Sequence, residues 1–204
     1  MNASYLKEQS EGLIHHYSHL KSNVRTKFGV LIGGNTDGVI FDEEKIYTLL
    51  DQIKKAALHY NADILLTTSR RTPANIEQII VKALRNFERC SLCIIANQRN
   101  IPQAVGGILA LSDLVIVSGE SISMISESLS AAKRTIVFSP RGQYGEKPRD
   151  KYEEFVLKLN DQGYLMMSSV YDMNAKITQL LSYKITMKSL DDQNIIQRGL
   201  EAIV

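Results

Sequence analysis

Two adjacent arginines, Arg70 and Arg71, stand among hydroxyl side chains directly after an apolar segment. The run reads Thr67-Thr68-Ser69-Arg70-Arg71-Thr72-Pro73, in which a capping threonine followed by a proline is typical of a helix start. A guanidinium group offers a planar, permanently charged set of donors, and the first turn of a helix favours anions. The run therefore predicts a phosphate-binding turn that includes Thr68, Ser69, Arg70 and Arg71. A solvated basic turn explains the same residues equally well.

A glycine pair closes another apolar segment, which runs from Phe28 to Gly33. The turn Gly33-Gly34-Asn35-Thr36 begins with two residues that lack a Cβ, so their backbone N–H groups can approach an anion closely. The structural alternative is a tight strand-to-helix turn that needs glycine torsion angles. The pair by itself does not separate these two interpretations.

A third polar turn, Ser118-Gly119-Glu120-Ser121, follows the apolar segment 114–117. The helix expected after it carries Ser123 and Glu127. A carboxylate such as Glu127 can accept hydrogen bonds from a ribose diol, as acidic residues do in dinucleotide sites. The structural alternative makes Ser121 or Ser123 a helix cap and leaves Glu127 exposed. Open α/β sheets bind ligands beyond the carboxyl ends of their strands, so three such clusters at one edge favour a ligand site.

Several common sites are absent from the sequence. Neither the dinucleotide fingerprint G-x-G-x-x-G nor the P-loop G-x-x-x-x-G-K-S/T follows the first apolar segment, which argues against a nicotinamide dehydrogenase and a P-loop ATPase. Cys90 and Cys93 form one C-x-x-C pair with no second pair for zinc, so we expect buried structural cysteines. His15 and His19 have a metal-binding spacing without an evident third ligand, so we expect a solvated helix face. We expect no metal and no cofactor.

The elements that would position these turns alternate along the chain. Segments typical of strands are 28–33, 62–67, 92–96, 114–117 and 135–138, with a weaker one at 164–166. Helical patterns cover 3–22, 42–60, a stretch that begins at Thr72, 106–111, 122–132, 148–161, 172–183 and 189–202. Near-continuous apolar strands between amphipathic helices predict an α/β fold of the Rossmann-like, doubly wound type. We expect a parallel sheet of about six strands in the order 3-2-1-4-5-6.

Composition narrows the class of protein. The 204 residues are 44% hydrophobic and 23% charged, which suffices for a domain with a sizeable core. A formal charge of +2, 7% aromatic residues and no tryptophan argue against a nucleic-acid partner. The apolar runs are too short to cross a bilayer, no export signal is visible, and two cysteines suit a reducing compartment. We therefore expect a cytoplasmic protein without a transmembrane segment.

The polar turns resemble those of a known family. The matching segments are Leu31 to Thr36 with Phe41-Asp42, the run Thr67 to Pro73, and Val117 to Glu127. They are similar to the C-terminal half of the mitochondrial-fission elongated-mitochondria proteins, a family that is widespread in bacteria and resembles glycosyltransferases of the GT-B fold. The similarity covers residues 28–140, and the string Thr-Thr-Ser-Arg-Arg-Thr-Pro is its most specific part.

The resemblance implies a GT-B C-terminal lobe that binds a nucleotide-diphosphate sugar without a metal. The diphosphate would be faced by Gly33, Gly34, Arg70 and Arg71. The rest of the donor would be lined by Ser118, Gly119, Glu120, Ser121 and Ser123, and the ribose would be held by Glu127. The expected site is completed by Asn35, Thr68 and Ser69. The catalytic base would come from the other lobe, so none is named.

We divide the chain into an N-terminal helix and linker (1–27), a Rossmann-like nucleotide-sugar-binding domain (28–183) and a C-terminal helix (184–204). That last helix carries an apolar stripe formed by Ile195, Ile196, Leu200 and Ile203. A missing N-terminal lobe or a second copy of the chain would cover it. The isolated chain is then expected to lack transferase activity.

Three functions compete on this evidence. The first is a donor-binding lobe of a GT-B glycosyltransferase-like protein. The alternative is a non-enzymatic protein-interaction module, because some relatives with this fold recruit a partner. A nucleotide-binding regulator without transfer chemistry is the third. The polar turns favour the first function, which the fold alone could not do.

Overall fold

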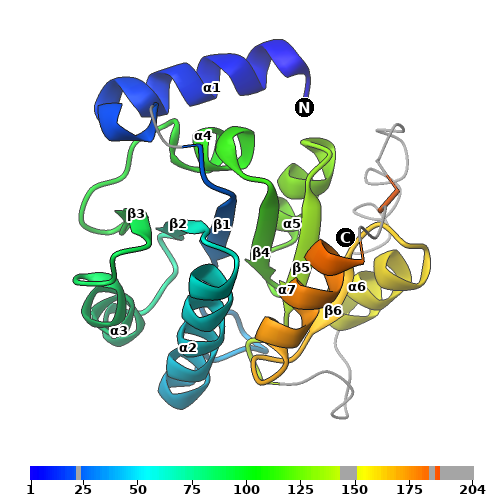
Figure 1. Ribbon diagram of the computed structural model, residues 1–204. Helices are drawn as coiled ribbons and strands as arrows, with labels where there is room; N and C mark the ends of the chain where they lie inside the picture. The colour runs from blue at the N-terminus through cyan, green and yellow to red at the C-terminus, as the bar shows by residue number, and fades with distance from the viewer. Residues whose placement is uncertain (22–23, 143–150, 184–186, 189–204) are drawn as a thin grey trace.

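The computed structural model describes residues 1–21, 24–142, 151–183 and 187–188, and it shows a parallel sheet between two layers of helices (Figure 1). The strands are β1 (Lys27–Ile32), β2 (Asp63–Thr68), β3 (Cys90–Ile94), β4 (Leu114–Ser118), β5 (Arg134–Phe138) and β6 (Met166–Ser168). The helices are α1 (Ala3–His16), the 3-10 helix η1 (Ser18–Leu20), α2 (Glu43–His59), α3 (Ala74–Leu84), α4 (Ala104–Leu111), α5 (Ile122–Ser130), α6 (Lys151–Asp161) and α7 (Met173–Ser182). The predicted helix 189–202 and its apolar stripe lie outside the described residues.

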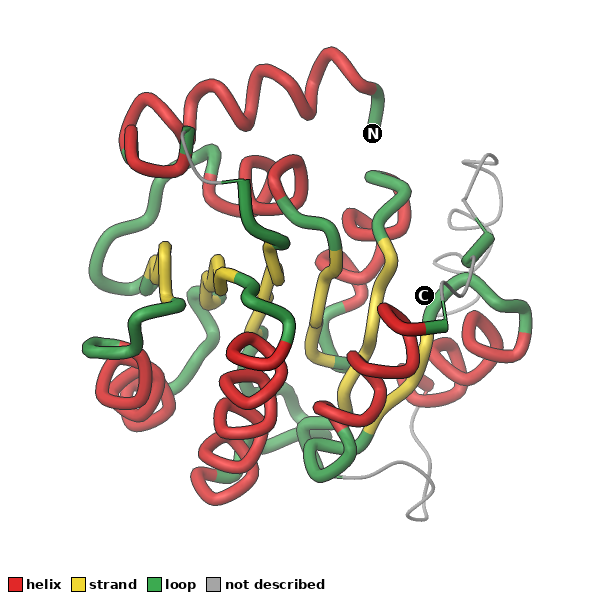
Figure 2. Tube along the Cα trace, in the orientation of Figure 1, coloured by secondary structure: helices red, strands yellow, loops and turns green. Residues whose placement is uncertain are grey.

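The strands run parallel in the order β3-β2-β1-β4-β5-β6 (Figure 1), which confirms the predicted fold class and strand order. Figure 2 shows the strands in yellow between the helices in red. Strand β1 lies between β2 and β4 and pairs with both of them. In β1, Ile32 is opposite Thr68, the last residue of β2, and Leu31 is opposite Val117, the residue before the end of β4. The turns that follow these three strands therefore leave the sheet side by side.

Two strands differ from the predicted bounds by two residues. Strand β3 is Cys90–Ile94 rather than 92–96, because Cys90 already pairs with Ile64 before the register shifts. Strand β6 is Met166–Ser168 rather than 164–166, because its first residue is the one that pairs with β5. Apolar residues indicated that each segment is a strand, but pairing with the neighbouring strand determines the residue at which each strand begins.

Successive side chains of the strands alternate between two cores. In β1, Phe28, Val30 and Ile32 face the layer formed by α2, α3 and α7. Leu31 faces the opposite layer, formed by α1, α4, α5 and α6 (Figure 1). Every residue of β1, β2 and β4 is buried, which is why their sequences are almost continuously apolar. Within the described residues, no helix is long and apolar enough to span a membrane.

Candidate ligand-binding site

The glycine turn after β1 is hydrogen-bonded to the turn after β4. The N–H of Gly33 donates to Ser118 Oγ at 2.8 Å, and the N–H of Gly34 donates to Glu120 Oε1 at 2.9 Å. Ser118 Oγ donates to the same carboxylate oxygen at 3.1 Å. The two N–H groups that were expected to face a diphosphate are therefore engaged by side chains of the protein itself. In this arrangement a carboxylate takes the place predicted for an anionic ligand.

Glu120 is an acidic side chain in the protein interior, with only 4% of its surface exposed. Its Oε2 atom is buried and has no hydrogen-bond partner among the described residues. Burial raises the pKa of Glu120 to about 7, although hydrogen bonds from its own backbone, Ser118 and Gly34 and the charge of Arg71 act in the opposite direction. Near neutral pH the group is thus divided between acid and carboxylate, and such groups concentrate at functional sites.

Thr72 ties the turn after β2 to the same glycine turn. Its hydroxyl donates to the carbonyl of Gly33 at 2.5 Å and accepts the N–H of Ser69 at 3.0 Å. The prediction that Thr72 caps the next helix is therefore wrong. Helix α3 begins at Ala74 with Pro73 in the cap position and no side-chain cap. The threonine instead bonds to a buried carbonyl that no other side chain is shown to satisfy among the described residues.

The two arginines of the predicted phosphate turn lie at the surface beside this cluster. Arg70 and Arg71 are both exposed. The main chain of Arg71 is so close to the glycine turn that a Cβ on Gly34 would lie 2.1 Å from its carbonyl carbon. The N–H of Arg71 donates to Ser69 Oγ at 3.0 Å, and the charge of Arg71 acts on Glu120. The turns after β1, β2 and β4 therefore form one polar cluster with a cation at its rim.

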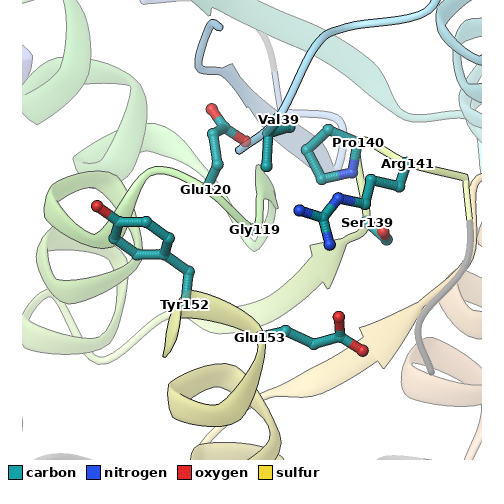
Figure 3. A pocket seen from close by; sticks show the side chains of 8 residues that line it. All are labelled: Val39, Gly119, Glu120, Ser139, Pro140, Arg141, Tyr152 and Glu153. Carbon is teal, nitrogen blue, oxygen red and sulfur yellow. The ribbon is translucent and has the colours of Figure 1, made fainter. Parts of the chain in front are cut away.

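A small cavity of about 20 Å³ adjoins Glu120, which is enough space for about one water molecule. Figure 3 shows the side chains around it, which are Val39, Gly119, Glu120, Ser139, Pro140, Arg141, Tyr152 and Glu153. Arg141 donates from Nη2 to the carbonyl of Gly38 at 2.6 Å. It stands in the basic run 141–149 after β5, of which residues 143–149 lie outside the described residues. Tyr152 and Glu153 come from α6, and no sequence signal pointed to them.

Two other predicted residues stabilise turns within the protein. Asn35 accepts the N–H of Phe41 on its Oδ1 at 2.9 Å and so closes the loop that leads into α2. Thr68 accepts the N–H of Ala96 on its Oγ1 at 2.9 Å and links the ends of β2 and β3. The exposed Asn35 keeps its amide nitrogen as a donor for a ligand, whereas Thr68 is buried.

Helix α5 begins two residues after Glu120, and with its cap residue it carries the remaining predicted residues. Ser121 is buried in its cap position, but its side chain makes no capping hydrogen bond. Ser123 is exposed and Glu127 is half-buried, and four residues apart they share one face of the helix. Burial raises the pKa of Glu127. For Arg70, Ser123 and Glu127 the described residues show no hydrogen bond or ion pair to the polar cluster.

The two cysteines and the spaced histidines do not form a metal centre in the described part of the chain, where no three potential ligands come together. Cys90 and Cys93 are half-buried and unpaired by a disulfide. Burial raises the pKa of Cys90 to about 11 and that of Cys93 to about 12, so both thiols are protonated at neutral pH. His19 instead contacts the carbonyl of Ser91 at 2.8 Å.

The sheet order and helix layers define an α/β protein of the Rossmann-like, doubly wound class. A protein described as a UDP-N-acetylglucosamine 2-epimerase from Listeria monocytogenes has this fold, with a TM-score of 0.57 and 13% identity over 91% of this chain and 46% of that one. A UDP-forming α,α-trehalose-phosphate synthase from Burkholderia xenovorans matches with a TM-score of 0.51 and 8% identity over 98% of this chain and 44% of that one. At 13% and 8% identity, these two matches show a shared fold only.

The chain belongs to the Mitochondrial fission ELM1 family, which matches residues 4–196. This membership confirms the resemblance seen in the three polar turns. An uncharacterized protein, RP120, from Rickettsia prowazekii is 28% identical over 127 residues, which are 61% of this chain and 34% of the relative. The matched region thus spans about a third of that relative's length.

Proposed function

We propose that the chain is the nucleotide-diphosphate-sugar-binding lobe of a GT-B glycosyltransferase-like protein. The main support for this proposal is that hydrogen bonds join the turns after β1, β2 and β4 into one polar cluster at the carboxyl edge of the sheet. Open α/β sheets bind their ligands at this edge. Arg70 and Arg71 beside the cluster and Arg141 at the adjoining cavity supply the positive charge that a diphosphate needs.

In the proposed complex the diphosphate lies against the Gly33-Gly34 turn, so Glu120 must first give up the N–H of Gly34. A carboxylate and a phosphate cannot share these donors, because like charges at contact distance repel strongly. A pKa of about 7 lowers this obstacle, since protonation of Glu120 near neutral pH costs little free energy. Arg141, which lines the adjoining cavity, offers a cation to a displaced carboxylate.

The ribose is assigned to Glu127 on helix α5. Its carboxylate is half-buried, and its raised pKa indicates that burial has removed part of its hydration. The hydroxyl oxygen of the neighbouring Ser126 is buried without a hydrogen-bond partner among the described residues. Ribose hydroxyls would restore hydrogen bonds to a carboxylate in this environment.

The acceptor site and the catalytic base are assigned to a second lobe. The matched region covers 34% of the Rickettsia relative, and the chain covers less than half of each similar structure named above. The chain alone should then bind a donor without transferring its sugar. Turnover of a nucleotide sugar by the purified chain would contradict this assignment.

A thermal-shift series over uridine and guanosine diphosphates and their sugars tests the proposed function. A ligand that binds only the folded state adds about 2.7 kcal/mol to its stability at a hundredfold excess over Kd. We expect at least one of these ligands to raise Tm. Inorganic phosphate or sulfate, added at a concentration that supplies the same anionic charge, should raise Tm less. If no nucleotide in the millimolar range exceeds the phosphate control, the chain is not a nucleotide-binding lobe.

A further inference from the structure

Strand β3 is an open edge of the sheet. It is the last strand on its side, and among the described residues no other strand pairs with its outer edge. Main-chain groups of successive residues point alternately to the two sides of a strand. The N–H of Ile64 in β2 donates to the carbonyl of Arg89, and Ser91 is the extra residue at the register shift that follows. Beyond the shift the inward positions are Leu92 and Ile94, so the N–H and C=O of Cys93 face outward, on the side where the carbonyl of Ser91 contacts His19. The edge therefore presents main-chain donors and acceptors to an incoming chain.

A groove of about 500 Å³ runs along this edge, between η1, α3 and the segment after β3. Val81, Leu84 and Leu92 give it apolar walls. Unlike the fully buried β1, β2 and β4, strand β3 has three half-buried residues among its five. An apolar hollow beside a free strand edge is the form that peptide-binding domains use to add a strand to a sheet.

The polar rim of the groove is positively charged. Arg85 and Arg99 line it and are exposed, and neither forms an ion pair with the described residues. None of the described residues that line the groove is acidic. A neighbouring hollow on α3 adds Lys82 and contains Arg85 as well. Pairing of β3 with β3 of a second copy would bring these like charges together, so the rim favours an acidic partner over another copy of the chain.

We propose that the β3 edge binds an extended acidic peptide segment of a partner protein by strand addition. The N–H and C=O of Cys93 would pair with the peptide main chain. Alternate apolar side chains of the peptide would enter the groove beside Val81 and Leu84 of α3, and its carboxylates would meet Arg85 and Arg99. This surface lies at the far edge of the sheet from β5 and β6, and it gives the protein-interaction alternative a physical site that is independent of nucleotide binding.

The cysteines of the groove provide the reporters for a test. Cys90 and Cys93 are the only two cysteines of the chain, and both line the groove. The probe is a short peptide that alternates glutamate and valine. One control peptide replaces glutamate with lysine, and the other replaces the central valine with proline, which removes a main-chain donor. The readouts are the backbone amide shift of Cys93 by NMR and the rate of maleimide labelling of both thiols by mass spectrometry. Labelling is measured at raised pH, because both thiols are protonated at neutral pH.

We expect the acidic peptide to shift the Cys93 amide and to slow labelling of both cysteines, with little effect from either control peptide. Arg85→Glu combined with Arg99→Glu should weaken the acidic peptide at least about tenfold, because attraction becomes repulsion. The amide spectrum of that double variant shows whether the fold is kept. Equal binding of the lysine or proline peptide would overturn the proposal, as would an absence of any effect at millimolar peptide.

Discussion

Glu120 gives the site its unusual electrostatic character. Its carboxyl group accepts the N–H of Gly34 at 2.9 Å and the hydroxyl of Ser118 at 3.1 Å, yet its other oxygen is buried without a partner among the described residues. A buried carboxyl with an unsatisfied oxygen is costly to keep ionised. The protonation of Glu120 therefore affects the hydrogen bond that it accepts from Gly34 in the glycine turn.

We predict that Glu120→Gln weakens the pH dependence of stability. The folded-state pKa of about 7 lies above the ordinary value of 4.5, so the folded protein holds more protons than the unfolded chain between these values. The contribution of Glu120 to stability is therefore fully present at low pH and is lost as pH rises through this window, by on the order of 3 kcal/mol. Glutamine keeps an acceptor for Gly34 and does not titrate.

Urea unfolding of the wild type and Glu120→Gln at about pH 5 and about pH 8 measures this difference. The fall in unfolding free energy with rising pH should be clearly smaller in the variant. Glu8→Gln is the matched control, because its carboxyl is exposed on α1 and lies outside the polar cluster. An unchanged slope in Glu120→Gln would show that this carboxyl titrates normally in the folded protein.

At the scale of elements, Thr72 locks the turn after β2 onto the turn after β1. It is 3% exposed, donates to Gly33 and accepts from Ser69. We predict that Thr72→Val lowers the free energy of unfolding by about 1–3 kcal/mol, because valine has the same shape but leaves the buried carbonyl of Gly33 without its donor. The N–H of Ser69 keeps its hydrogen bond to the carbonyl of Ile32. Thr72→Ser keeps the hydroxyl and should recover most of the loss in a urea titration. Equal stability of the two variants would mean that the hydrogen bonds do not hold the turns together.

The same contacts show what the sequence could predict and what it could not. Apolar runs and amphipathic spacing indicated each strand, because those patterns depend on burial alone. The strand order followed from the usual arrangement of doubly wound sheets. The polar and glycine residues after the apolar segments also predicted that Gly33 and Ser118 lie at the same carboxyl edge of the sheet. The position of the Glu120 carboxyl depends on a contact across 86 residues with Gly34, for which a local pattern carries no signal. Tyr152 and Glu153 reach the cavity only through the packing of α6.

At the scale of the whole molecule, the two proposed binding surfaces lie at different places on the sheet. The carboxyl ends of β1, β2 and β4 form the proposed nucleotide site, and the outer edge of β3 forms the proposed peptide groove. Substitutions at the groove should leave nucleotide binding unchanged, and substitutions at the polar cluster should leave peptide binding unchanged. This independence allows Arg85, on the groove, to act as a control for the arginines of the nucleotide site.

Calorimetric titration of uridine or guanosine diphosphate tests the central claim most directly. The wild type should bind, and Arg70→Ala and Glu127→Ala should each weaken binding by roughly 1.5–3 kcal/mol, the usual range for a charge-assisted hydrogen bond. Arg85→Ala removes an exposed arginine at the β3 edge and should bind like the wild type. If the wild type binds and neither Arg70→Ala nor Glu127→Ala weakens the binding, the nucleotide does not occupy the edge formed by the three polar turns.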